Sequence, residues 1–147
     1  MNDSLILQTR LASMLAFDLD GIFLPDIVYQ PETFSTVHRV RTSLLKPIFI
    51  PDQPYYIITG RPVDDREETL AWIDQFAMHP KAVFHDNRDI QYPALYKERV
   101  LKEHDEITHY IESDAAQVAY LTDRVPCRVM LFDELLRYGI AAGIEGK

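Results

Sequence analysis

The chain has 147 residues, 47% of them hydrophobic and 26% charged, and its 23 acidic residues against 15 lysines and arginines give a formal charge of −8. This length predicts a single domain over residues 1–147 with a core that needs no disulfide or structural metal. The acidic balance argues against general binding of duplex nucleic acid, and the single cysteine, Cys127, excludes an internal disulfide and a Cys-rich zinc site.

The hydropathy pattern and the N-terminal sequence indicate where in the cell the protein is expected. No apolar run approaches the roughly 18–20 residues that a membrane helix needs. The N-terminal sequence MNDSLILQTR places an acid before a very short apolar stretch, which is the wrong order for a signal peptide. We therefore expect a cytoplasmic protein with no membrane partner.

Apolar runs and helical stretches alternate along the chain. We expect five strands, at 14–19, 55–59, 82–84, 107–111 and 127–132, and the second of them ends at Gly60. We expect helices at 33–45, from Asp64 to a stop at His79 and Pro80, at 93–104, and from near Asp114 to a stop at Pro126. A flap or hairpin is expected at 22–31, and a short helix with a tail at 140–147 follows the last strand. Strands separated by helices of this length predict an α/β fold with a mainly parallel five-stranded sheet.

Local signals support three of the helices. Asp64 stands three residues before Glu67, as in a capping box, and Leu70 and Ile73 would share one apolar face. Pro93 suits the first turn of a helix. Asp114 has the position of an N-terminal cap for the last long helix, where Gln117 follows three residues later.

Polar side chains gather where the predicted strands end, which is the edge at which parallel sheets bind ligands. They are Asp18, Asp20 and Gly21 after the first strand, Thr59, Gly60 and Arg61 after the second, His85 and Asp86 after the third, Lys97 and Lys102 on the helix before the fourth, and Glu112, Ser113 and Asp114 after the fourth.

This set suits phosphoryl transfer, which needs a nucleophile, an acid for the leaving oxygen and positive charge. Asp18 can attack phosphorus as a carboxylate nucleophile, and Asp20 can act as general acid and then as general base. Thr59 can hold phosphoryl oxygens, and Lys97 can neutralise both Asp18 and the phosphate. Glu112 or Asp114 can help Asp18 to hold Mg²⁺.

The string LAFDLDG resembles the first motif of the haloacid dehalogenase superfamily, and YYIITGRP is similar to its second. The resemblance covers residues 14–114 and implies a Rossmann-like three-layer fold, Mg²⁺ dependence and phosphatase activity through an aspartyl-phosphate. It implies Asp18 as nucleophile and Asp20 as general acid and base. Thr59 matches the phosphate-binding hydroxyl, and Lys97 the motif lysine, with Lys102 as the alternative.

The fourth motif departs from the usual pattern of paired aspartates, since this chain has Glu112-Ser113-Asp114. The expected metal ligands are therefore Asp18 and Asp20 with Glu112 or, second, Asp114. Gly60 and Arg61 are expected at the phosphate beside Thr59, although Arg61 can instead pair with Asp64 or Asp65. Asp114 can equally serve only as a helix cap.

Neither interval between these motifs has room for a large cap domain. In the family that the chain resembles, small caps go with macromolecular substrates or with sites closed by oligomerisation. The substrate can therefore be a nucleic-acid end, a phosphoprotein or a small phosphomonoester. The chain can also form a homo-oligomer.

Two non-enzymatic alternatives remain. One is a receiver-like domain phosphorylated at Asp86, but the stretch after Phe132 lacks the lysine that such domains place there. The other is a degenerate haloacid dehalogenase-like domain that binds a partner without turnover, and the unusual fourth motif is the feature that favours it.

Overall fold

The computed structural model describes residues 13–24, 45–86 and 92–135. The flap expected at 22–31 lies outside these residues from 25 onward. The expected helix at 33–45 lies outside them up to residue 44, as does the whole of the tail at 140–147.

Within these described residues, five parallel strands form the sheet, as the alternating pattern predicts. They are β1 (Leu15–Phe17), β2 (Tyr55–Pro62), β3 (Val83–Asp86), β4 (His109–Glu112) and β5 (Arg128–Leu131). Their order across the sheet is β3-β2-β1-β4-β5, and every neighbouring pair is parallel. The three-residue strand β1 is thus central, and the carboxyl end of each strand points to one edge.

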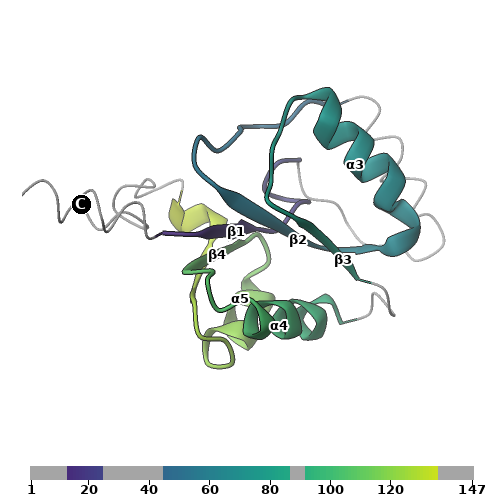
Figure 1. Ribbon diagram of the computed structural model, residues 1–147. Coiled ribbons are helices and arrows are strands. Elements are labelled where there is room, and N and C mark those ends of the chain that lie inside the picture. Colours follow the sequence, from purple (N-terminus) through teal and green to yellow (C-terminus); the bar gives the residue numbers. More distant parts are fainter. Residues whose placement is uncertain (1–12, 25–44, 87–91, 136–147) are drawn as a thin grey trace, which may run out of the picture.

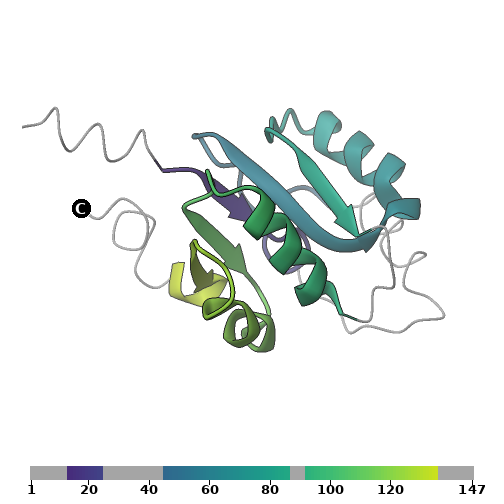
Figure 2. The same cartoon turned by 60° about the horizontal axis from the view of Figure 1, so that its bottom comes forward.

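Helices cover both faces of the sheet (Figure 1). The short 3-10 turn η1 (Val63–Asp65) leads into α3 (Arg66–Gln75) on one face, and α4 (Pro93–Glu103) and α5 (Ala115–Thr122) lie on the other. Figure 2 shows α4 and α5 side by side in front of the sheet, and the two helices are in contact. This is the three-layer α/β arrangement expected from the sequence.

The strands are apolar on both sides because both faces are covered. Leu15 and Phe17 of β1 pack with Trp72 of α3, whereas Ala16 faces the opposite cluster with Leu101 of α4. All five of these side chains are buried. Successive residues of one short strand therefore join two separate cores, which fixes the register of β1 and with it the position of the next residue, Asp18.

Several boundaries differ from those expected. Strand β2 does not end at Gly60 but continues to Pro62, and β3 extends to Asp86, so that Asp86 lies within the strand. The capping box at Asp64 is wrong, since the helical path begins at Val63 and Asp65 takes the N-cap position of α3 without a side-chain cap bond. Consequently the buried face of α3 is Thr69, Trp72 and Ile73.

The other two helix starts are confirmed. Pro93 opens α4, and Asp114 caps α5 by accepting a hydrogen bond of 2.9 Å from the backbone N–H of Ala116. These two starts matter for function because both lie at the carboxyl edge of the sheet.

Candidate active site

Asp18 follows the last residue of the central strand. Its backbone N–H continues the ladder by donating to the carbonyl of Ile111 on β4 at 3.0 Å, and its Oδ1 accepts from the backbone N–H of Leu19 at 2.8 Å. The chain then turns at Gly21, whose φ of 87° suits glycine, and Phe23 packs into the core. This turn returns the chain to the core directly after Asp18, whose side chain is buried at the strand end.

Lys97 is the lysine of this site. Its Nζ lies 3.3 Å from Oδ1 of Asp18, and it donates to Oε1 of Glu112 at 2.7 Å and to Oε1 of Gln117 at 2.9 Å. Lys97 is only 1% exposed, although it lies in the second turn of a helix that begins at the surface. Lys102, the alternative, is instead exposed and pairs with Glu98 four residues earlier.

Glu112 is fully buried, and all of its acceptor capacity is used. Its Oε1 accepts from Lys97 and from the hydroxyl of Tyr110 at 2.8 Å, and its Oε2 accepts from the backbone N–H groups of Ser113 and Asp114 at 3.0 and 3.1 Å. A carboxylate offers about four acceptor sites, so four donors saturate it. Glu112 therefore acts here as the anchor of Lys97, and it presents no free oxygen to a metal ion.

Burial and charge set the ionisation of this cluster. Burial, and then the neighbouring charge of Glu112, raise the pKa of Asp18 well above its ordinary value, although Lys97 opposes this shift. Burial would also raise the pKa of Glu112, but the Lys97 ammonium and the hydrogen bonds outweigh it and lower that pKa. Burial would lower the pKa of Lys97, but the two carboxylates raise it. The lysine is thus held as a cation, while the pKa of Asp18 stays raised.

Ser113 is a site residue that the sequence reasoning passed over. Its hydroxyl lies 3.3 Å from Oδ2 of Asp18 and 3.1 Å from the backbone carbonyl oxygen of Asp20. Ser113 was passed over because the metal ligands expected after this strand were the acids Glu112 and Asp114, and the side chain of Ser113 is neutral.

The oxygens that fit Mg²⁺ in this site are the Asp18 carboxylate, the Asp20 backbone carbonyl and the Ser113 hydroxyl. Adjacent ligands of an octahedral Mg²⁺ ion lie about 2.9 Å apart, close to both separations at Ser113. The carboxylate of Asp18, the carbonyl of Asp20 and the hydroxyl of Ser113 are hard oxygen donors, and Mg²⁺ accepts one or two carboxylates with water in its remaining positions. Among the described residues, no three His, Cys, Asp or Glu side chains form a metal-binding group.

The Asp114 side chain is not part of this set of three oxygens. Its two oxygens accept from the backbone N–H of Ala116 and, at 3.3 Å, from the side-chain amide of Gln117. The structure therefore places Asp114 as the cap of α5. Of the four expected metal ligands, Asp18 and Asp20 present a carboxylate oxygen and a backbone oxygen to Ser113, whereas the oxygens of Glu112 and Asp114 accept hydrogen bonds from other groups.

Asp20 is held by Arg61. The guanidinium donates from Nε to Oδ2 at 2.8 Å and from Nη2 to Oδ1 at 2.9 Å, and its Nη1 donates to the hydroxyl of Thr69 at 3.1 Å. Arg61 is itself 1% exposed, and Thr69 donates in turn to the carbonyl of Asp65. Arg61 thus joins the start of α3 to the candidate general acid, a partner that the sequence reasoning did not consider.

Thr59 and Gly60 lie on β2 beside this fork. Phe17 pairs with Ile57, so Thr59 lies at the same edge of the sheet as Asp18, and its hydroxyl oxygen accepts from the backbone N–H of Arg61 at 3.0 Å. A Cβ at Gly60 would lie 2.7 Å from Cβ of Pro93. Gly60 therefore allows the start of α4, and so Lys97, to approach the sheet.

His85 is a buried neighbour on β3. Its Nδ1 lies 3.3 Å from Nη1 of Arg66, and among the described residues its Nε2 has no hydrogen-bond partner. Burial, and then the charges of Arg66 and Arg61, lower the pKa of His85 to about 4. The imidazole is consequently neutral near neutral pH and adds no charge beside Arg61.

We compared the chain with protein families, curated proteins and solved structures. No protein-family model and no curated protein matches the chain. A solved structure described as a candidate 3-deoxy-D-manno-octulosonate 8-phosphate phosphatase from Vibrio cholerae is similar over 88% of this chain and 71% of its own, at 17% identity and a TM-score of 0.39. Within the part of the chain that the structure describes, no helix is long and apolar enough to cross a membrane.

Proposed function

We propose that the chain is a Mg²⁺-dependent phosphomonoesterase of the haloacid dehalogenase type that forms an aspartyl-phosphate on Asp18. The observation that carries the proposal is the contact of Lys97 with Asp18 at 3.3 Å at the carboxyl end of the central strand. A buried carboxylate beside a buried ammonium, both at the ligand-binding edge of a parallel sheet, suits attack on an anionic ester.

The first half-reaction forms a bond between a carboxylate oxygen of Asp18 and phosphorus, and it breaks the bond between phosphorus and the leaving oxygen. Lys97 offsets the negative charge of both reacting groups. Asp20 gives its proton to the leaving oxygen, so an alcohol departs. In the second half-reaction the oxygen of a water molecule forms a bond with phosphorus and Asp20 takes the proton of that water. The bond between phosphorus and the Asp18 oxygen breaks, which releases inorganic phosphate and restores the Asp18 carboxylate.

The residues around Asp18 have supporting roles. Glu112 and Gln117 fix the Lys97 ammonium, and Thr59 offers its hydroxyl proton to a phosphoryl oxygen. Asp18, Asp20 and Ser113 would hold Mg²⁺ through the oxygens described above, and bound Mg²⁺ would supply further positive charge to the phosphoryl oxygens. Asp20 must leave the fork of Arg61 to protonate the substrate, so movement at that ion pair is part of the proposed cycle.

The test is hydrolysis of an aryl phosphate by the purified protein, with Mg²⁺ and with EDTA, beside Asp18→Asn. We expect metal-dependent release of phosphate that the substitution abolishes, and a phosphoryl adduct on Asp18 in acid-quenched protein analysed by mass spectrometry. Turnover by Asp18→Asn at the wild-type rate would rule out this nucleophile.

A second candidate, a binding domain without turnover, is favoured by two observations. The side chain beside Asp18 and the backbone oxygen of Asp20 is the neutral hydroxyl of Ser113, and Arg61 donates to both carboxylate oxygens of Asp20. Binding of Mg²⁺ and phosphate without hydrolysis of any aryl, sugar or nucleic-acid 3′-phosphate ester would favour this candidate over the phosphatase.

A further inference from the structure

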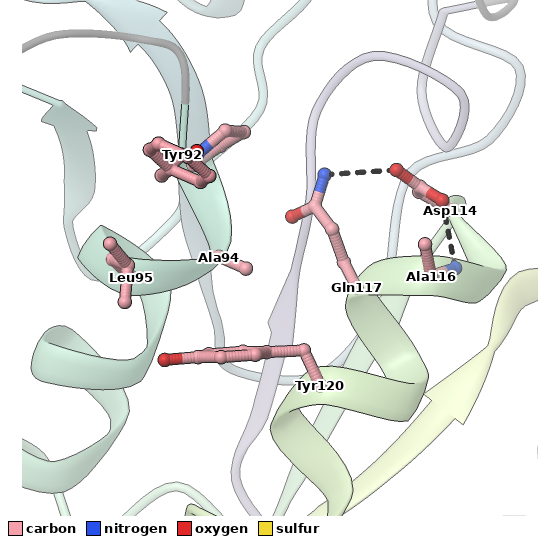
Figure 3. Close-up of a pocket in the computed structure, with 8 residues that line it drawn as sticks. Tyr92, Ala94, Leu95, Asp114, Ala116, Gln117 and Tyr120 are labelled. Carbon is pink, nitrogen blue, oxygen red and sulfur yellow. Dashed lines mark hydrogen bonds between the residues drawn. The ribbon is translucent and has the colours of Figure 1, made fainter.

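A hollow of about 440 Å³ lies between the first turns of α4 and α5 (Figure 3). Tyr92 and Leu95 line it from the side of α4, and Gln117 and Tyr120 line it from α5. Pro93, Ala94 and Ala116 complete its apolar wall, with Asp114 at the cap of α5. Its volume is in the range of small-molecule sites.

Gln117 is shared by this hollow and the proposed active site. Its side chain lines the hollow, and its Oε1 accepts from Nζ of Lys97, which in turn lies 3.3 Å from Asp18. Two contacts of hydrogen-bond length therefore separate the hollow from the nucleophile. Gln117 is thus the side chain through which the hollow adjoins the proposed phosphate site.

Tyr120, which lines the hollow from α5, is held by two contacts. The hydroxyl of Tyr120 donates to Glu98 at 2.6 Å, and the guanidinium of Arg124 lies 4.0 Å from the centre of the Tyr120 ring. By contrast, Tyr92 is 67% exposed and Leu95 is 50% exposed at the rim. An apolar ligand that covers these two side chains and packs on the Tyr120 ring gains from the burial of apolar surface.

Charge limits the kind of ligand. Of the eight residues that line the hollow, Asp114 alone is charged, and its carboxylate is exposed. A second phosphate or a nucleic-acid backbone would meet this negative charge and no neutralising lysine or arginine in the lining. Two tyrosine rings with aliphatic neighbours suit a flat, uncharged group instead.

We infer that the hollow between α4 and α5 binds the organic part of the substrate, and that the substrate is a phosphomonoester of a flat, apolar alcohol. The inference rests on the proposed phosphatase activity at Asp18. It narrows the substrate from any phosphomonoester to one with a single phosphate and an aromatic or similarly planar group.

The test compares Ala116→Trp, which fills the hollow, with Ala115→Trp, which adds the same ring at an exposed alanine of the same helix outside the lining. The first readout is the ratio of kcat/KM for 1-naphthyl phosphate to that for methyl phosphate. The second is binding of (1-naphthylmethyl)phosphonate, which cannot be hydrolysed at its carbon–phosphorus bond, by calorimetry in the presence of Mg²⁺.

We expect the wild type and Ala115→Trp to favour the naphthyl ester at least tenfold, and Ala116→Trp to lose most of that preference and to bind the phosphonate at least tenfold more weakly. Equal ratios and equal phosphonate binding in both variants would overturn the inference while the phosphatase proposal stands. Absence of all hydrolysis would instead contradict the proposed function. The calorimetry would then show by itself whether the hollow binds the naphthyl group. No binding of the phosphonate by the wild type would overturn the inference.

Discussion

Replacing Glu112 by Gln separates its two possible roles, anchor of Lys97 or ligand of Mg²⁺. The substitution keeps the shape of the side chain but turns one acceptor oxygen into a donor, so two of the four groups that donate to Glu112 lose their acceptor. Lys97 stays buried with Asp18 and Gln117 as its remaining partners.

The expected cost follows from these contacts. Breaking a buried ion pair costs about 3–5 kcal/mol, and a buried donor left without an acceptor costs about 1–3 kcal/mol. Because Lys97 keeps a second carboxylate, we expect the free energy of unfolding to fall by about 3 kcal/mol. That is a large share of the roughly 5–15 kcal/mol that stabilises an ordinary domain.

Urea unfolding of the metal-free protein measures this change. With a slope of about 1.5 kcal/mol per molar urea, the midpoint would fall by about 2 M. Glu98→Gln is the matched control, because it weakens the ion pair with the exposed Lys102 while the remaining side-chain oxygen can still accept from Tyr120. We expect it to lower the free energy of unfolding by less than about 1 kcal/mol. The same samples are then titrated with Mg²⁺ by calorimetry, and we expect Glu112→Gln to bind Mg²⁺ with affinity near that of the wild type wherever it is folded.

A loss of stability below 1 kcal/mol, together with a large loss of Mg²⁺ affinity, would refute this reasoning. Glu112 would then be a metal ligand, and its four hydrogen bonds would not describe the metal-bound protein. A large loss of stability with unchanged Mg²⁺ affinity would establish the anchor.

Four further outcomes are expected. Asp18→Asn should lower kcat by about a thousandfold or more while circular dichroism shows an unchanged fold. Ser113→Asp should tighten Mg²⁺ binding about tenfold by calorimetry, since it adds a charged ligand, and a weaker site would contradict the proposed oxygen set. Gly60→Ala should lower stability by about 1–3 kcal/mol in urea, because its Cβ would lie 2.7 Å from Pro93. Because the folded-state pKa of His85 is about 4, the unfolded chain binds a proton on this residue that the folded protein does not, so His85 alone should lower the free energy of unfolding by roughly 3 kcal/mol as pH drops from 6.5 to 4. The difference between wild type and His85→Gln in urea midpoints across this range measures that contribution, because the titration of the other groups cancels.

The sequence was sufficient for the parts of the fold that depend on alternating apolar runs. All five strands lie where such runs occur, and Asp18, Thr59 and Lys97 lie at one edge because parallel strands share their direction. Lys97 was distinguishable from Lys102 through Pro93, which sets the start of α4 and so the turn on which each lysine lies.

The parts that sequence reasoning missed depend on contacts between distant segments. Gly60 does not end β2, because its missing side chain serves packing against Pro93 and not a turn. The partner of Arg61 is 41 residues away, and no local pattern identifies Asp20 as that partner. Ser113 was passed over since its significance comes from two oxygens on another strand end.

The central position of β1 has a consequence for the order in which the molecule assembles. This three-residue strand is flanked by β2 on one side and β4 on the other, and its neighbour Met14 donates to Thr108 across a separation of 94 residues. During synthesis the first strand must therefore wait for most of the described chain before its second edge is paired. Such long-range parallel pairing closes large loops and folds slowly. A nascent chain that stalls before residue 112 therefore exposes the unpaired apolar edge of β1 and lacks Glu112 and Gln117, two of the three partners of Lys97.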